Sequence, residues 1–113
     1  MSPNSPRDEI PPGTLDMLIL KTLARGQEMH GFEIADAIQQ RSSKVLQVEE
    51  GSLYPALQRM LIKGWIAGEW SRTEENRRAR YYRLTPSGRK HLDREIAAYR
   101  RVAQAIALIL SPI

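Results

Sequence analysis

The chain has 113 residues, of which 42% are hydrophobic and 27% charged, as expected for one modest globular domain. It contains no cysteine, so disulfides and thiolate chemistry are excluded, and its two histidines lie far apart, so no metal or other cofactor is expected. No apolar run approaches the roughly 20 residues needed to span a membrane, and the first residues lack the apolar core of a signal peptide. No catalytic constellation or phosphate-binding loop is present. We therefore expect a cytoplasmic protein that is not an enzyme and does not bind a membrane.

The net charge is +4, and the basic residues gather in the second half of the chain. Residues 72–83 hold five Arg against two Glu, and residues 86–101 hold five basic against two acidic residues. Such clustering favours a polyanionic partner, although a basic surface that only meets solvent is the alternative.

The chain is expected to divide into three parts. Residues 1–12 contain four of the seven prolines and predict a flexible tail. Residues 13–85 predict a folded domain, and residues 86–113 a separate long helix.

Helical periodicity begins after Thr14, an acceptable N-cap, and stops at Gly26. A second helical pattern follows GQEMHG and ends near residues 41–43, with Phe32, Ile34, Ala35 and Ile38 on its apolar face. Two amphipathic helices are therefore expected before residue 45.

The stretch GSLYPALQRM predicts a third helix, in which Leu53, Leu57, Met60 and Leu61 form one buried face. Because proline is tolerated near the start of a helix, Pro55 predicts that the helix begins at residues 50–52, with Ser52 as the N-cap. Gly64 ends this helix.

Residues 65–84 predict a β-hairpin, because strand-forming Trp65, Ile66 and Trp70 are separated from Tyr81, Tyr82 and Leu84 by the polar TEENRR. Its register cannot be read from the sequence. We interpret Trp65, Tyr82 and Leu84 as packing residues.

Thr85 and Pro86 then predict the N-cap and first residue of the last helix. Its apolar residues recur at spacings of three and four over about five turns, close to a coiled-coil seam. We therefore expect a dimerisation surface formed by Leu92, Ile96, Tyr99, Ala103, Ile106 and Leu110. His91 is expected at the surface, and a helix lying on a membrane is a weaker alternative.

Three helices followed by a hairpin predict a mainly α fold with a small β-hairpin, the winged helix-turn-helix, extended by a long C-terminal helix. In that fold the third helix enters the major groove of DNA and the hairpin lies over an adjacent groove or the backbone. The free N–H groups at the start of a helix attract phosphate, and Arg and Gln pair with base edges. The residues expected to contact DNA are Ser52, Tyr54, Pro55, Gln58, Arg59, His30, Arg77, Arg78 and Arg80.

The motifs GTLDMLILKTLARG, HGFEIADAI, VEEGSLYPALQRM, KGWI and RRARYYRLTPSGRKHL resemble the PadR family of bacterial transcriptional regulators over residues 13 to about 110. The resemblance implies a homodimeric repressor that binds a palindromic DNA operator and pairs through its last helix. The short chain resembles the subfamily with a single C-terminal helix. A small-molecule effector is known for some members.

Two departures from the family pattern stand out. Leu61 replaces an acidic residue that is frequent in the family, and the last helix carries Tyr99 but no Trp. The second departure argues against a flat drug held between interface tryptophans. The alternatives that remain are a winged-helix protein-interaction module and a ligand-sensing dimer with a small molecule between its last helices.

Overall fold

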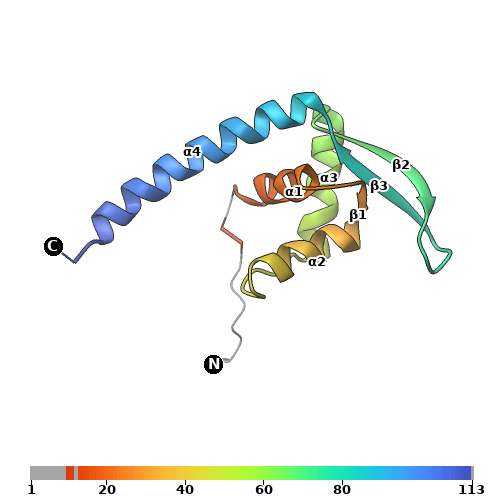
Figure 1. Cartoon of the computed structure of the whole chain (residues 1–113), viewed down its shortest axis with the longest axis horizontal. Coiled ribbons are helices and arrows are strands. Elements are labelled where there is room, and N and C mark those ends of the chain that lie inside the picture. Colours follow the sequence, from red (N-terminus) through yellow and green to blue (C-terminus); the bar gives the residue numbers. More distant parts are fainter. Residues whose placement is uncertain (1–9, 12, 113) are drawn as a thin grey trace.

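The computed structural model describes residues 10–11 and 13–112, so nearly all of the tail predicted at residues 1–12 lies outside the described residues. The described chain folds into helices on one side of a small antiparallel sheet, with a long helix leaving the body (Figure 1). In chain order the elements are α1 (Leu15–Ala24), β1 (Met29–His30), α2 (Gly31–Arg41), α3 (Glu50–Lys63), β2 (Ile66–Arg72), β3 (Arg78–Leu84) and α4 (Pro86–Leu110). The mainly α, winged-helix prediction is confirmed. None of these helices is both long and apolar enough to cross a membrane.

The core lies between α1, α2 and α3, and the sheet and α4 close it. The predicted apolar faces of α1 and α3 are buried as expected, because their hydrophobic residues recur at helical spacing. Strands β2 and β3 and helix α4 each add one buried side chain to this core, namely Ile66, Tyr82 and Leu92. The core therefore joins the base of the hairpin and the start of α4 to the three-helix body.

The third helix begins within the predicted span, at Glu50, but its N-cap is Glu49. The prediction of Ser52 as N-cap is wrong, because Ser52 already lies inside the first turn and its N–H donates to the Glu49 carbonyl at 3.0 Å. Gly64 ends the helix in the left-handed conformation, with φ of 79°, as its position predicts. Ser52 is left with its side chain exposed at the start of α3.

The sheet has three strands in the order β1-β3-β2, one more than the predicted hairpin. The added strand is the two-residue β1, in which Met29 pairs with Tyr82 and His30 with Tyr81. We call β2, β3 and the connecting residues 73–77 the wing. In the wing Trp70 pairs with Arg80, and Arg72 with Arg78.

The start of α4 is fixed to the end of α3. The Thr85 hydroxyl accepts from the Gly88 N–H at 3.0 Å and donates to the Gly64 carbonyl at 2.6 Å. The ring of His91 stacks on Trp65, with centroids 3.6 Å apart. The prediction of His91 as a surface residue is therefore wrong, because α4 places this ring on Trp65 and leaves its side chain only 18% exposed.

Two further expectations are corrected by burial. Phe32 was expected on the apolar face of α2, but it lies in the first turn, outside the core, and is 72% exposed. Leu92 was expected at a dimer surface, but it is 1% exposed and belongs to the core of its own chain. The first turns of α4 thus cover the domain, and only the later turns carry free apolar side chains.

Candidate nucleic-acid interface

The outer side of α3 is the surface that the fold offers to a partner. Its inward side, built on Leu53, Leu57 and Met60, is fully used by the core. The helical periodicity that buries those residues places Ser52, Pro55 and Gln58 on the outer side, and all three are exposed. The helix therefore carries three of its predicted DNA-contacting side chains on one accessible ridge.

Tyr54 lies at the edge of this ridge, beside α2. Its side chain is 48% exposed, and its hydroxyl passes close to Gly31, the first residue of α2. A β-carbon built on Gly31 would lie 2.8 Å from that hydroxyl, so glycine leaves the room that Tyr54 occupies. The phenol is thus positioned by packing while its outer part stays accessible.

Arg59 points to the other edge of α3 and has a partner within the chain. Its Nη2 lies 2.9 Å from Oδ1 of Asp16 on α1. The pair is exposed, so its contribution to stability is small, about 0–1 kcal/mol. Its geometric consequence is larger, because Asp16 fixes where the guanidinium lies and leaves the other N–H donors of the fork free.

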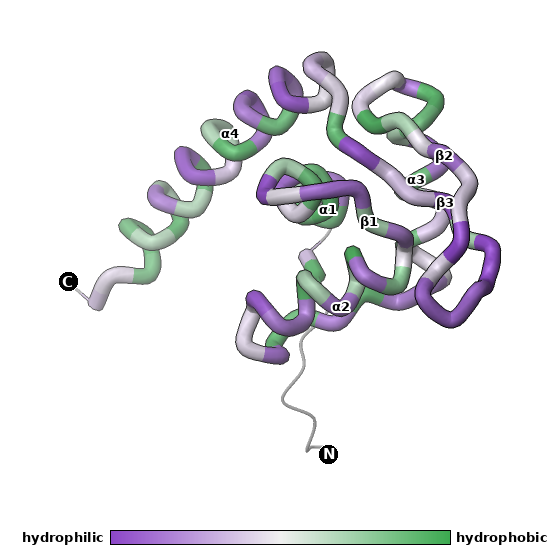
Figure 2. The backbone as a smooth tube through the Cα atoms, turned by 45° about the vertical axis from the view of Figure 1, so that its right-hand side comes forward, coloured by the Kyte–Doolittle hydropathy of each residue, from purple (hydrophilic) through white to green (hydrophobic). Residues whose placement is uncertain are grey.

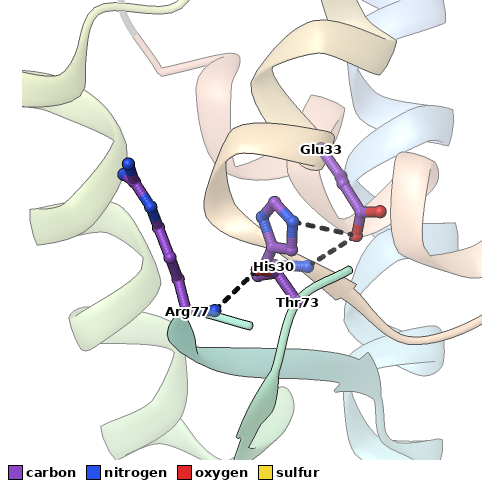
Figure 3. Close-up of polar contacts among 4 residues, drawn as sticks. All are labelled: His30, Glu33, Thr73 and Arg77. Atoms are coloured by element: carbon purple, nitrogen blue, oxygen red, sulfur yellow. Dashed lines mark hydrogen bonds and ion pairs between the residues drawn. The ribbon is translucent and has the colours of Figure 1, made fainter. Parts of the chain in front are cut away.

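His30 is the N-cap residue of α2 and is held by the first turn of that helix (Figure 3). Its backbone N–H donates to Oε1 of Glu33 at 3.0 Å, and its ring Nε2 lies 3.7 Å from the same oxygen. The ring also meets Tyr81 edge-on at 5.2 Å. His30 is therefore largely engaged by its own chain, which leaves less of it for DNA than the sequence suggested.

The turn of the wing is strongly hydrophilic (Figure 2). It is closed by backbone bonds and by the N–H of Arg77, which donates to the Thr73 hydroxyl at 3.1 Å. Figure 3 shows the Arg77 side chain extended away from His30 and Glu33. Arg77 thus presents its charge at the wing tip, as predicted, although Glu74 and Glu75 share that tip.

Strand register decides which wing residues lie together. Successive side chains of a strand point to opposite faces, so the observed pairing places Trp70 and Arg72 on the same face as Arg78 and Arg80. This face continues from the core side of the sheet, where Ile66 and Tyr82 are buried. The predicted Arg78 and Arg80 are therefore neighbours on the inner face of the wing, and Arg77 is apart from them in the turn.

Trp70 and the arginines form a stacked group on that face. The Arg78 guanidinium lies 4.6 Å from the Trp70 ring centroid, and the Arg80 guanidinium 6.0 Å from it. Gly68 makes room for Arg80, since a β-carbon there would lie 2.7 Å from the Arg80 Nε. Within the described part of the chain, the arginines found in ion pairs are Arg59 and Arg83, not these two.

A cavity of about 380 Å³ opens between the inner face of the wing, α3 and the start of α2. We call it the wing groove. Aromatic rings and arginines form most of its wall, and the residues used below are Phe32, Tyr54, Gln58, Trp70, Arg78 and Arg80. Tyr54 and Gln58 of α3 thus meet Arg78 and Arg80 of the wing along one hollow.

Two tyrosines of β3, one in the wall of the groove and one on the opposite face, have raised pKa values. Burial raises the pKa of Tyr82 above its usual value of 10, the neighbouring Tyr54 raises it further, and Arg80 opposes this rise. The pKa of Tyr81 is also raised, first by desolvation and then by Glu33, Glu74 and Glu75. Both phenols are therefore neutral at pH 7, as a tyrosine with its usual pKa of about 10 also is.

The later turns of α4 carry the remaining predicted dimer residues. Ile96 packs against the core, Ala103 is half-buried, and Tyr99, Ile106 and Leu110 are 49–76% exposed. Hydrophobic and hydrophilic residues alternate around this helix in Figure 2, and its C-terminal end projects from the body in Figure 1. An unpartnered apolar stripe therefore begins where α4 leaves the domain.

Sequence reasoning missed two residues of the groove. Phe32 was assigned to the apolar face of its helix and Trp70 only to a strand of the hairpin, yet both are exposed, Trp70 by 58%. Large apolar rings are usually buried. Phe32 is exposed because it lies in the first turn of α2, and Trp70 is exposed because the strand register places it on the inner face of the wing.

An exposed third helix beside a basic wing defines the class of winged-helix regulators of transcription. Comparison with known proteins agrees with this assignment. The sequence model described as "Transcriptional regulator PadR-like family" matches residues 19–94. The chain belongs to this family, whose members are transcriptional regulators and not enzymes.

Solved structures match most of this chain. A transcriptional regulator from Clostridium thermocellum is 28% identical, with a TM-score of 0.79 over 88% of this chain and 95% of that one. A PadR family transcription regulator from Clostridium difficile is 30% identical, with a TM-score of 0.74 over 88% of this chain and 100% of that one.

Curated sequences give two further relatives. An uncharacterized protein X of Lysinibacillus sphaericus is 28% identical over 92% of this chain and 94% of its own length. A 37.1 kDa protein in a transposon of Streptomyces fradiae is 40% identical over 77% of this chain but only 23% of its own length. The chain therefore matches most of the length of the first relative and corresponds to a small part of the second.

Proposed function

We propose that the chain is a sequence-specific DNA-binding repressor that acts as a homodimer on a palindromic operator. The observation that supports this most is the exposed ridge of α3, with Ser52 and Gln58, lying beside a wing whose Arg78 and Arg80 have no carboxylate partner among the described residues. Gln58 of the ridge and these two arginines line one hollow, an arrangement that suits a duplex if a helix enters its major groove and a wing lies on the next groove.

In this proposal α3 reads the bases. The N–H groups of Glu50 and Gly51, the first two of α3, and the Ser52 hydroxyl bind a phosphate. Gln58 reaches an adenine edge, and Arg59, aimed by Asp16, contacts phosphate or guanine. Tyr54 and Pro55 pack against the sugar-phosphate backbone beside them.

The wing supplies affinity that depends little on sequence. Arg77 at the tip and Arg78 and Arg80 on the inner face contact phosphates or enter the minor groove. His30 takes a secondary part, because its ring is partly covered by Tyr81 and Glu33. Each neutralised phosphate releases counterions, so binding should weaken steeply with salt.

The homodimer is proposed to form through α4. Large apolar side chains on its later turns, among them Val102, Ile106 and Ile109, are more than half exposed in the single chain, and a second copy of the helix would cover them. Two recognition helices related by a twofold axis would then meet half-sites about 34–36 Å apart. A dimer on such a site excludes polymerase from an overlapping promoter.

Selection of bound duplexes from a pool of random DNA tests this function, because the protein itself then picks out its operator. The proposal predicts an inverted repeat whose half-site centres are about 10–10.5 base pairs apart, or a multiple of that spacing. Recovery of unrelated sequences would contradict it and would favour a winged helix that binds proteins.

A further inference from the structure

We propose that the wing groove holds one strand of the DNA duplex and that Trp70 packs flat against a deoxyribose there. Arg78 and Arg80 would bind the phosphates on either side of that sugar. This inference rests on the DNA-binding function proposed above and adds an aromatic contact to it.

The wall of the groove has the chemistry of a sugar-phosphate strand. Its most exposed rings are Phe32 at 72% and Trp70 at 58%. Exposure of such large apolar rings to solvent is energetically unfavourable, and residues of this type are usually buried. Cations flank these rings, and among the described residues no carboxylate is found in an ion pair with Arg78 or Arg80. A strand of DNA alternates an apolar sugar face with an anionic phosphate, so it matches both features at once.

The opposite face of the wing provides the contrast. Side chains from Glu69, Ser71, Tyr81 and Arg83 point that way, and the Arg83 guanidinium lies 3.9 Å from a Glu28 carboxylate oxygen. That face therefore has no free arginine pair and no exposed indole. Charge complementarity selects the inner face, and the inner face is the one turned toward α3.

The group is also arranged before any ligand arrives. The Arg78 guanidinium and the Trp70 ring stack at 4.6 Å, which limits the freedom of both side chains. Arg80 lies across Gly68, and its Nε is buried without a hydrogen-bond partner in the described part of the chain. This buried contact holds Arg80 against the wing, so a phosphate would bind it through its terminal guanidinium N–H groups.

The first test moves the indole without changing composition. The double variant Trp70→Ser with Ser71→Trp places the ring on the other face of the same strand, because neighbouring strand residues point in opposite directions. We expect operator affinity to fall roughly tenfold or more, as for loss of an aromatic contact to nucleic acid. Trp70→Phe keeps a flat ring and should lose less. Circular dichroism and thermal unfolding establish that each variant is folded.

The second test asks whether the ring itself is covered by DNA. In the wild-type protein, acrylamide should quench the exposed Trp70 readily, and operator DNA should reduce that quenching. In Trp70→Phe only Trp65, stacked on His91, remains, so DNA should change its quenching little. This readout separates direct contact by Trp70 from an indirect effect through Arg78.

The outcomes are distinct. If the wild-type protein binds the operator and the double variant binds it equally tightly, the Trp70 contact is overturned while the DNA-binding function stands. The same holds if the wild-type protein binds and acrylamide quenches it equally with and without DNA. Failure of the wild-type protein to bind any duplex removes the proposed function and this inference with it. Weakened binding together with protection of Trp70 supports both.

Discussion

Gly88 lets α4 pack closely against the backbone of Trp65, just beyond the end of α3. A β-carbon at this position would lie 2.0 Å from the backbone carbonyl oxygen of Trp65, and the backbone on both sides is fixed by hydrogen bonds. We expect Gly88→Ala to lower the free energy of unfolding by about 3 kcal/mol through overpacking. Gly51→Ala is the matched control, since nothing lies within 4 Å of its added methyl group, and it should leave stability equal or up to about 1 kcal/mol higher. Urea unfolding that gives the two variants the same stability would refute this account of the junction.

Arg59 gives a second prediction at the residue scale. Asp16 should orient the Arg59 guanidinium, and the guanidinium should contact DNA. Arg59→Ala should therefore weaken operator binding by about 2 kcal/mol, the value of a charge-assisted hydrogen bond. Asp16→Asn should cost less, because the guanidinium is kept and only its aim is loosened. Both should unfold within about 1 kcal/mol of wild type, since the ion pair is exposed. Titration by fluorescence anisotropy checks this, and wild-type affinity in Arg59→Ala would make the pair a structural link only.

At the scale of elements, the wing should act through phosphate charge. Arg77→Ala combined with Arg78→Ala should weaken binding to specific and scrambled duplexes alike, and should flatten the plot of log affinity against log salt by about 0.9 for each lost phosphate contact. Arg83→Ala removes the same charge from the opposite face of β3, where Glu28 lies nearby, and should leave the slope unchanged. An equal slope in the double variant and the wild type would count against phosphate contacts by the wing.

The long helix α4 should pair the subunits through its exposed stripe. Ile106→Asp places a charge in the middle of that stripe and should convert dimer to monomer, because a buried unpaired carboxylate is strongly unfavourable. Gln104→Asp adds the same charge to a different side of the helix and should leave the dimer intact. Light scattering coupled to size-exclusion chromatography measures both masses, and a dimeric Ile106→Asp protein would place the interface elsewhere.

Local patterns predicted the elements that have strong local signals. The helices of residues 15–24, 50–63 and 86–110 were expected, because their apolar residues recur at helical spacing and their ends carry Gly64 or Thr85. The strand β1 was not expected, since two residues have no pattern of their own and Met29 and His30 become a strand only by pairing with β3. Element existence follows local propensity, whereas this pairing depends on the tertiary fold.

At the scale of the whole molecule, the sequence predicted the fold and the family, and the match to the PadR-like transcriptional regulators confirms both. That the residues around Tyr54 and the arginines of the wing contact DNA stays a prediction. Which arginines share a face with Trp70 could not be known, because a shift of one residue in register would send every wing side chain to the opposite face. The same holds for Leu92, since whether a helix buries a residue in its own domain or in a partner depends on where that domain ends.

The central claim is sequence-specific DNA binding, and fluorescence anisotropy tests it most directly. The purified protein is titrated against a labelled duplex from upstream of its own gene, with scrambled duplex as competitor, at two salt concentrations. The account predicts binding that resists the competitor and weakens strongly at the higher salt. Binding no tighter than to scrambled DNA, both here and in selection from random duplexes, would contradict it.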